Sequence, residues 1–341
     1  MSQRPSIAGL DLPAAANTSK LRRILQATLT QHGTSIRTTM YPLQSPTAPN
    51  STLTQVRSPW DSLPTSPAAP DAAIDAVPAY WQASHFGLDR VTLFQNAGPA
   101  EQHAILAHAN QNLLEEAYFI EQAGMGYMSR MALLADSIEE RMLYTLFAAE
   151  ETTHFVQLSP FLSTPPAATS GPFLRLLAEL VESEDKSVLL FVIQVVLEGW
   201  GLTHYRQLAA SCQDATLAHL LQSFLQDESR HHGTGVTLFN QTHVSPSSQA
   251  AIVEILAQFL QMVQVGPQGI VAAIAQVKGG LSYNQRLQIF EELNAPVQSG
   301  DRLRLLRTLM RGEGADRIIQ ALDEWGAFQP QTPAQCASVQ I

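Results

Sequence analysis

The sequence predicts an all-α protein whose central part is a four-helix bundle, made of two antiparallel hairpins joined by one long crossover, with additional helices after it. Three observations predict this class. Apolar residues recur at helical spacing from about residue 99 to residue 325, and no strand pattern competes with them. Two Glu-x-x-His motifs recur at an interval of 77 residues. Helix breakers predict a short turn within each half of this repeat and a long connection between the two halves.

Length and composition exclude several classes of function. The 341 residues are 45% apolar and 15% charged, with a net charge of −10, which argues against a nucleic-acid-binding surface. Two distant cysteines, Cys212 and Cys336, provide neither a disulfide framework nor a Cys-x-x-Cys site. The longest apolar run, roughly residues 187–197, is too short to span a bilayer. We therefore expect a cytoplasmic protein with neither a nucleic-acid nor a membrane partner.

Residues 1–75 are rich in Ser, Thr, Pro, Ala and Gln, and we expect a disordered tail with one candidate helix from Lys20 to Gln31. Up to Trp60, the only acid is Asp11, against six Lys and Arg. Such a bias also occurs in transit peptides, so an organellar location is the alternative to the cytoplasm.

The bundle is expected between residues 76 and 245. Ser137-Ile138-Glu139-Glu140 is a capping box and predicts the start of its second helix. A long loop rich in Pro and Ser follows that helix and predicts the crossover. The predicted bundle helices cover residues 99–134, 138–158, 187–210 and 215–239, and a shorter helix in the crossover covers 173–183.

Further helices form a C-terminal extension from residue 246 to 328, followed by a tail from 329 to 341. Gly and Pro separate them, Pro296 among these breakers. No motif in this extension indicates a function, so it could cover the bundle, form a dimer interface or bind a partner. The predicted helices cover residues 249–263, 268–277, 283–293, 301–311 and 315–325.

The two Glu-x-x-His motifs, Glu151–His154 and Glu228–His231, carry the chemistry. A carboxylate and an imidazole three residues apart project from one face of a helix. Another glutamate, Glu121 or Glu198, stands 30 residues before the glutamate of each motif. In an antiparallel hairpin, residues equidistant from the turn lie at one height. Both sets of residues can therefore meet in the bundle interior.

Four carboxylates and two imidazoles on four helices form the ligand set of di-iron and di-manganese bundle proteins. Oxygen and nitrogen ligands of this kind suit iron or manganese better than zinc. We expect two iron ions, with a mixed manganese/iron centre as the alternative. Glu116 also has a tolerable spacing and is the alternative ligand to Glu121, although the repeat favours Glu121.

Partners for the two imidazoles can also be predicted. A metal-bound histidine usually donates its other N–H to a carboxylate. Asp227 and Glu150 each directly precede a predicted ligand, so Asp227 can reach His154 and Glu150 can reach His231 from the opposite hairpin. Arg230 lies beside them and could pair with Glu150.

The segment Asp227-Glu228-Ser229-Arg230-His231, with its earlier counterpart and the two further glutamates, resembles the oxygen-activating di-iron carboxylate branch of the ferritin-like superfamily. That branch includes soluble methane monooxygenase hydroxylase, ribonucleotide reductase small subunits and acyl-carrier-protein desaturases. The resemblance covers about residues 100–240 and implies a ferritin-like bundle. Two departures stand out. Leu158 replaces the radical tyrosine of a reductase small subunit, and no threonine stands three or four residues after Glu198.

The resemblance implies an oxygen-dependent di-iron oxidoreductase, an oxygenase or oxidase. It would act on an organic small molecule or an acyl substrate with dioxygen. It also implies an external electron donor such as a ferredoxin, and we expect a homodimer. Two alternatives remain: a metal-stabilised helical protein that binds a ligand or partner, and the handling of iron or peroxide as in ferritins and rubrerythrins. The chain is much longer than a storage ferritin needs, and it lacks the Cys-x-x-Cys site typical of rubrerythrins.

Overall fold

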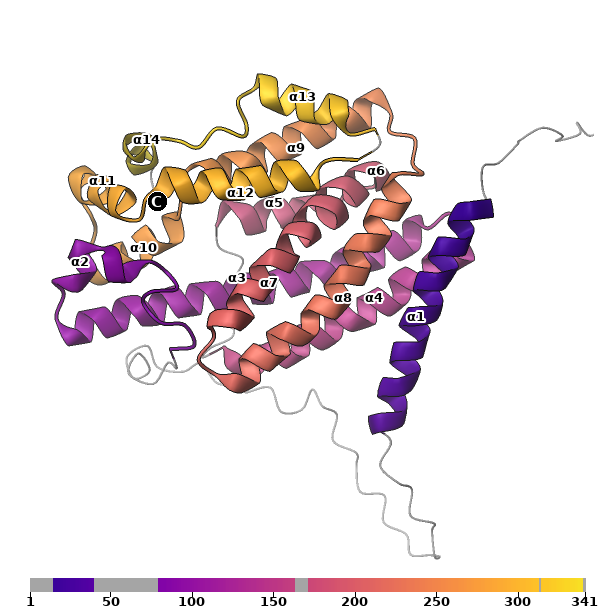
Figure 1. Ribbon diagram of the computed structural model, residues 1–341, viewed down its shortest axis with the longest axis horizontal. Helices are drawn as coiled ribbons and strands as arrows, with labels where there is room; N and C mark the ends of the chain where they lie inside the picture. The colour runs from indigo at the N-terminus through magenta and orange to yellow at the C-terminus, as the bar shows by residue number, and fades with distance from the viewer. Residues whose placement is uncertain (1–14, 40–78, 163–170, 313, 340–341) are drawn as a thin grey trace, which may run out of the picture.

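The computed structural model is all-helical over the residues that it describes, which are 15–39, 79–162, 171–312 and 314–339 (Figure 1). For the first helix, side chains are described at residues 20–32. No strand occurs within these ranges, so the predicted all-α class is confirmed.

Four long helical segments occupy the middle of the molecule as two hairpins (Figure 1). Ser137 caps the second segment by accepting a hydrogen bond from the backbone N–H of Glu140 at 3.1 Å. Asp214 caps the fourth by accepting one from Leu217 at 2.8 Å. Such caps satisfy N–H groups that the first helical turn leaves free. The segments are α3 (Pro99–Leu134), α4 (Ile138–Leu158), the run of α6 (Lys186–Leu189), η5 (Leu190–Leu197) and α7 (Glu198–Ser211), and α8 (Ala215–Phe239).

The third segment is not a regular α-helix, because η5 is π-helical and ends directly before Glu198. The corresponding part of α3 is regular. π-Helical turns are rare in proteins, and those that occur often lie at functional sites. The whole segment is long and apolar enough to cross a membrane, but 61% of its most apolar window is buried inside the fold, as in a core helix.

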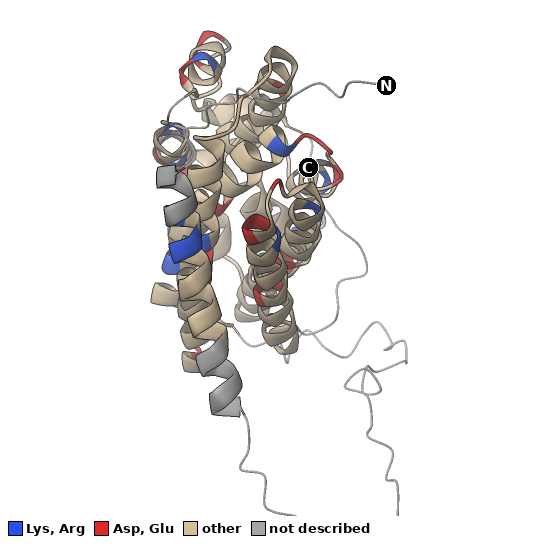
Figure 2. Cartoon of the chain, turned by 90° about the vertical axis from the view of Figure 1, so that its right-hand side faces the viewer, with Lys and Arg blue, Asp and Glu red and all other residues tan. Residues whose placement is uncertain are grey.

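The first described helix, α1 (Ala15–Thr39), lies across α4 and α8 (Figure 1). Leu21 and Leu25 are buried in the main hydrophobic core. Arg22 pairs with Glu139 at 3.1 Å. Figure 2 shows Lys and Arg in blue on this helix. Sequence analysis placed a shorter helix within an otherwise disordered tail, whereas this helix is part of the folded body. Residues 1–14 and 40–78 lie outside the described ranges.

The crossover contains η4 (Ser159–Phe161) and α5 (Pro172–Leu180), and residues 163–170 between them lie outside the described ranges. Before the bundle, Trp81 is fully buried. Its indole N–H donates to the carbonyl of Leu208 at 3.0 Å, and its backbone N–H donates to Asn110 Oδ1 at 2.8 Å. These bonds attach residues 79–90, which include η3 (Leu88–Arg90), to one end of the bundle.

Six helices follow the bundle and cover one side of it (Figure 1). The main core contains Phe191 from the bundle together with Leu256, Leu303 and Leu322, so the C-terminal extension has no separate main core. The helices are α9 (Pro246–Gln264), α10 (Gln268–Lys278), α11 (Tyr283–Glu292), α12 (Ala295–Leu309), α13 (Asp316–Glu324) and α14 (Pro333–Ser338).

Helices α12 and α14 differ from the sequence expectation, one in where it begins and the other in being present at all. The short helix α2 (Thr92–Gln95) was not expected either. Helix α12 begins at Ala295, because Pro296 lies in its first turn, where a missing N–H costs nothing. Helix α14 lies in the expected C-terminal tail. Thr332 and Gln335 form a capping box for it, and Cys336 is buried in a second hydrophobic core.

Candidate metal centre

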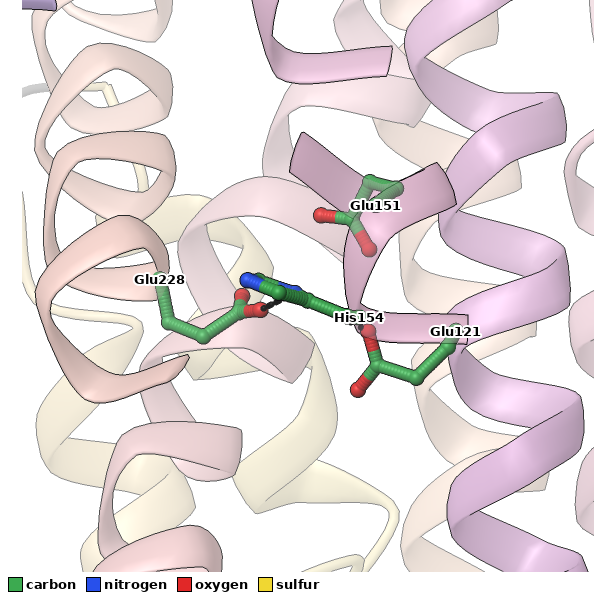
Figure 3. A group of neighbouring side chains, drawn as sticks. All are labelled: Glu121, Glu151, His154 and Glu228. Atoms are coloured by element: carbon green, nitrogen blue, oxygen red, sulfur yellow. Dashed lines mark hydrogen bonds and ion pairs between the residues drawn. The ribbon is translucent and has the colours of Figure 1, made fainter. Parts of the chain in front are cut away.

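Four predicted ligands converge in the buried interior. Glu121 comes from α3, Glu151 and His154 come from α4, and Glu228 comes from α8. One donor atom from each lies within 4.8 Å of the others. Figure 3 shows His154 between the carboxylates of Glu121 and Glu228. His154 Nδ1 lies 3.2 Å from Glu121 Oε2 and 3.4 Å from Glu228 Oε1.

His231 borders this group from α8. Its Nδ1 lies 3.0 Å from Glu151 Oε1 and 3.6 Å from Glu228 Oε2. Neither oxygen meets hydrogen-bond geometry with this nitrogen. Each histidine therefore turns the same ring atom, Nδ1, toward the carboxylates.

Glu198, at the start of α7, is not a member of the group of four but faces the same interior. It lines a cavity of about 80 Å³ together with Glu121, Glu151 and Glu228; we call this the inner cavity. Glu116, the alternative ligand, lines the inner cavity too and does not belong to the group of four.

The outer ring nitrogens are held across the two hairpins. His154 Nε2 lies 3.1 Å from Asp227 Oδ2, and His231 Nε2 lies 2.8 Å from Glu150 Oε2. Arg230 joins the two acids, donating to Glu150 at 2.7 Å and to Asp227 at 2.5 Å. An N–H donated from Nε2 leaves the lone pair of Nδ1 free for a metal.

Helix α1 completes this network. Gln31 Nε2 donates to Asp227 Oδ1 at 2.8 Å, and His32 Nε2 lies 2.9 Å from Glu150 Oε1. Sequence reasoning missed both residues, because no motif connects them with carboxylates more than 100 positions away. The network thus runs from α1 to the two buried imidazoles.

Burial and mutual repulsion perturb the carboxylates. Burial and the charge of Glu228 raise the pKa of Glu151 to about 8. Burial raises the pKa of Glu198 well above its usual value, and the neighbouring carboxylates add to this against the charge of His231. Burial also acts to raise the pKa of Glu228, but the close imidazoles of His154 and His231 lower it to about 2. The metal-free cluster therefore retains protons at neutral pH.

The imidazoles show the complementary effect. Burial alone would lower the pKa of His154, but its hydrogen bonds with Asp227, Glu121 and Glu228 raise it well above the usual value. For His231, burial acts in the same direction, and the hydrogen bond with Glu150 and the nearby carboxylates raise the pKa. A bound cation would take the place of these protons.

Two unpartnered atoms test whether the residues fit a metal. Glu198 Oε2 and His231 Nδ1 are buried and have no hydrogen-bond partner. Buried polar atoms are nearly always satisfied, so each such atom needs an explanation. Both face the cluster, and both are of the donor types that iron and manganese accept. The residues present therefore fit a metal site.

Glycines leave space beside the cluster. A Cβ at Gly124 would lie 2.4 Å from Glu151 Oε2, so the carboxylate occupies the space that a side chain would need. A Cβ at Gly201 would meet nothing within 4 Å. Gly201 lines the inner cavity, whose other walls include the apolar side chains of Ile120, Phe173, Leu177, Ile193 and Leu197.

Two further polar residues, Tyr205 and Gln194, lie near the cluster and form hydrogen bonds that sequence reasoning did not predict. Tyr205 donates a hydrogen bond to Glu121. Gln194, in the π-helical segment, accepts from Tyr127 at 2.8 Å and from Tyr144 at 2.7 Å, and donates to the carbonyl of His231 at 2.8 Å. An uncharged polar residue within the apolar run 187–197 was the available signal for Gln194.

A scan of protein-family models found none that matches the chain. Searches among curated proteins and among solved structures also found no match. The interpretation of the cluster therefore rests on its own geometry and chemistry.

Proposed function

We propose that the protein is a non-haem di-iron oxidoreductase that uses dioxygen to oxidise an organic small molecule, built on a ferritin-like four-helix bundle. One observation carries the proposal. Two buried imidazoles turn Nδ1 toward Glu121, Glu151 and Glu228, Glu198 lines the adjoining cavity, and acids of the opposite hairpin hold Nε2. This is the ligand set of di-iron and di-manganese bundle proteins.

The repeat suggests how the ligands divide between two ions. Glu121 and His154 would hold one ion, and Glu198 and His231 the other. Glu228 lies near both imidazoles and Glu151 lies near that of His231, so these two carboxylates would be the ones to contribute to both ions. A mixed manganese/iron pair would use the same donors.

The protein would supply binding, orientation and exclusion of water. When bound, ferrous ions supply electrons for the reduction of dioxygen. In a hydroxylation, R–H, dioxygen, two electrons and two protons give R–OH and water, and the electrons come from an external donor such as a ferredoxin. The apolar inner cavity would place the R–H group beside the ligands and exclude water there.

The proposal extends to the setting of the reaction. The acidic composition and the absence of a cysteine pair suit a cytoplasmic enzyme that receives its electrons from a separate protein. We also propose that the enzyme is a homodimer.

Metal content and dioxygen consumption test the proposal together. Full-length protein is reconstituted anaerobically with ferrous iron, desalted and subjected to elemental analysis, and then mixed with dioxygen in an oxygen electrode. We expect about two irons per chain, rapid dioxygen uptake and a new visible absorption band. Glu228→Gln should lose both the metal and the uptake. The matched variant Glu254→Gln, at an exposed position of α9, should retain them.

Two results would redirect the interpretation. Stoichiometric iron without dioxygen uptake would support a metal-stabilised ligand-binding protein. Uptake of many irons per chain would support iron storage. Absence of stoichiometric metal would contradict all three readings of the cluster.

A further inference from the structure

A larger cavity, of about 570 Å³, lies next to the inner one. It is enclosed by α3, α7, α10, α12 and the segment around residues 84–90; we call it the outer cavity. Its volume is typical of small-molecule sites. Glu116, Trp200 and His204 line both cavities. The two spaces therefore meet at a partition made of these three side chains.

Two arginines line the outer cavity, Arg90 from η3 and Arg302 from α12. Neither guanidinium forms a hydrogen bond or ion pair with any residue that the structure describes. Both arginines are exposed to solvent at the cavity, so each guanidinium is open to an anion that enters it.

The acids that line the cavity are Asp301 and Glu116, and neither forms an ion pair with Arg90 or Arg302. Asp301 already pairs with Arg304, which is not part of the cavity wall. Burial raises the pKa of Glu116, although Arg302 opposes the shift, so its carboxyl binds a proton more readily than an exposed one. Burial and the charge of Arg302 lower the pKa of His204 to about 4, and burial lowers that of His85, so both imidazoles are neutral near pH 7.

A protein with a net charge of −10 thus places two arginines without an ion-pair partner in the wall of this cavity. We propose that the outer cavity binds the acidic head group of an amphipathic organic molecule through Arg302 and Arg90, while the apolar part of that molecule passes the partition into the inner cavity. A guanidinium binds carboxylate or phosphate through two parallel hydrogen bonds. The apolar walls of the inner cavity, such as Ile120 and Phe173, suit a hydrocarbon.

This inference gives the C-terminal extension a role, because α10 and α12 form the outer wall of the cavity and α12 supplies Arg302. The proposed binding of an acidic amphipathic molecule depends only on the two cavities and not on a bound metal. That the bound molecule is the substrate, with its apolar end beside the metal ligands, rests on the proposed function.

Isothermal titration calorimetry on the metal-free, full-length protein tests the inference with octanoate, octyl phosphate and 1-octanol. We expect at least one acidic probe to bind about tenfold more tightly than 1-octanol or better, as one charge-assisted pair contributes. Arg302→Gln should remove that difference, and Arg302→Lys should keep part of it. Arg311→Gln, an exposed arginine just after α12, should leave it unchanged. The tighter of the two acids identifies the head group as carboxylate or phosphate.

A second variant tests where the apolar end lies. Gly201→Leu adds a side chain where the inner cavity is open, so it should weaken octanoate more than hexanoate. Equal affinity for the acids and the alcohol, affinity unchanged by Arg302→Gln, or no binding of any probe would overturn the proposal. Metal-free protein keeps this result separate from iron chemistry, since binding can succeed where dioxygen uptake fails, and the reverse.

Discussion

Gly124 and Gly126 stand on the same helix but face different surroundings. A Cβ at Gly124 would collide with the carboxylate of Glu151, whereas at Gly126 it would meet only Val181, at 4.0 Å. The colliding atom is the end of a flexible side chain, so the fold can adapt by moving the carboxylate. The cost then falls on the metal site and not on stability.

We predict that Gly124→Ala binds less than half as much iron as the wild type, with little change in thermal stability. Gly126→Ala should bind iron normally and gain stability, since alanine is favoured over glycine within a helix by about 1 kcal/mol. Elemental analysis after anaerobic reconstitution and thermal unfolding measure the two effects. Normal iron binding by Gly124→Ala would show that Glu151 is not a ligand.

Asp227 acts on the site through another residue, because it orients His154 and is itself held by Arg230 and Gln31. Loss of such a supporting carboxylate usually weakens metal affinity by about 10- to 100-fold. We predict this loss for Asp227→Ala, measured by competition with a ferrous chelator. Glu254→Ala, on the exposed face of α9, is the control. Unchanged affinity would show that the contact has no role in orienting the imidazole.

For individual residues, the sequence predicts most of the cluster but not the side chains that surround it. Glu121 and Glu228 are predictable because each has a counterpart 77 residues away, Glu198 and Glu151 respectively. The crossed contacts of Asp227 and Glu150 follow from their places beside the ligands. Tyr205 is not predictable, because which side chain reaches a carboxylate depends on the packing of helices from two different hairpins.

Among the elements, α1 is the one whose position gives it an unexpected role. It crosses α4 and α8, the two helices that carry the Glu-x-x-His motifs. Its residues Gln31 and His32 contact the acids that hold the imidazoles. Helix α1 therefore covers the network on the side away from the inner cavity.

We predict that the double variant Gln31→Ala, His32→Ala releases iron to a chelator several times faster than the wild type. Two partly buried hydrogen bonds contribute about 1–3 kcal/mol together, so the free energy of unfolding should fall modestly. Gln26→Ala, an exposed position of α1, should match the wild type in both measurements. Faster release by Gln26→Ala as well would mean that α1 acts only through its packing.

The boundaries of the elements were less predictable than their existence. Proline was read as a breaker at Pro296, whereas it belongs to the first turn of α12. The capping box at Thr332 was available in the sequence and signals α14. The π-helical geometry of η5 has no such signal, because its apolar residues suit an α-helix equally well.

For the whole molecule, the cluster makes stability depend on pH. The pKa of Glu151 rises from 4.5 to about 8 on folding, and those of Glu198, His154 and His231 also rise. Above about pH 6.5, where the lowered pKa values of His85, His108 and His204 no longer matter, the folded metal-free protein holds more protons than the unfolded chain, so its stability falls as pH rises. The lowered pKa of Glu228 acts only below about pH 4.5 and does not oppose this trend.

We predict that the metal-free protein unfolds at progressively lower temperature from about pH 6.5 to pH 8. Each group contributes up to about 1.4 kcal/mol per pH unit while it titrates. The iron-loaded protein should lack this fall, because the metal replaces the protons. Glu151→Gln should flatten the metal-free profile. A metal-free profile that rises over this range would contradict the inferred protonation of the cluster.

The crossed network also makes the two hairpins depend on each other. Each hairpin carries three of the predicted donors but takes the acid that orients its imidazole from the other hairpin. One hairpin alone would leave its histidine without that acid. Fragments 1–165 and 166–341, produced separately, should accordingly bind iron only after they are mixed.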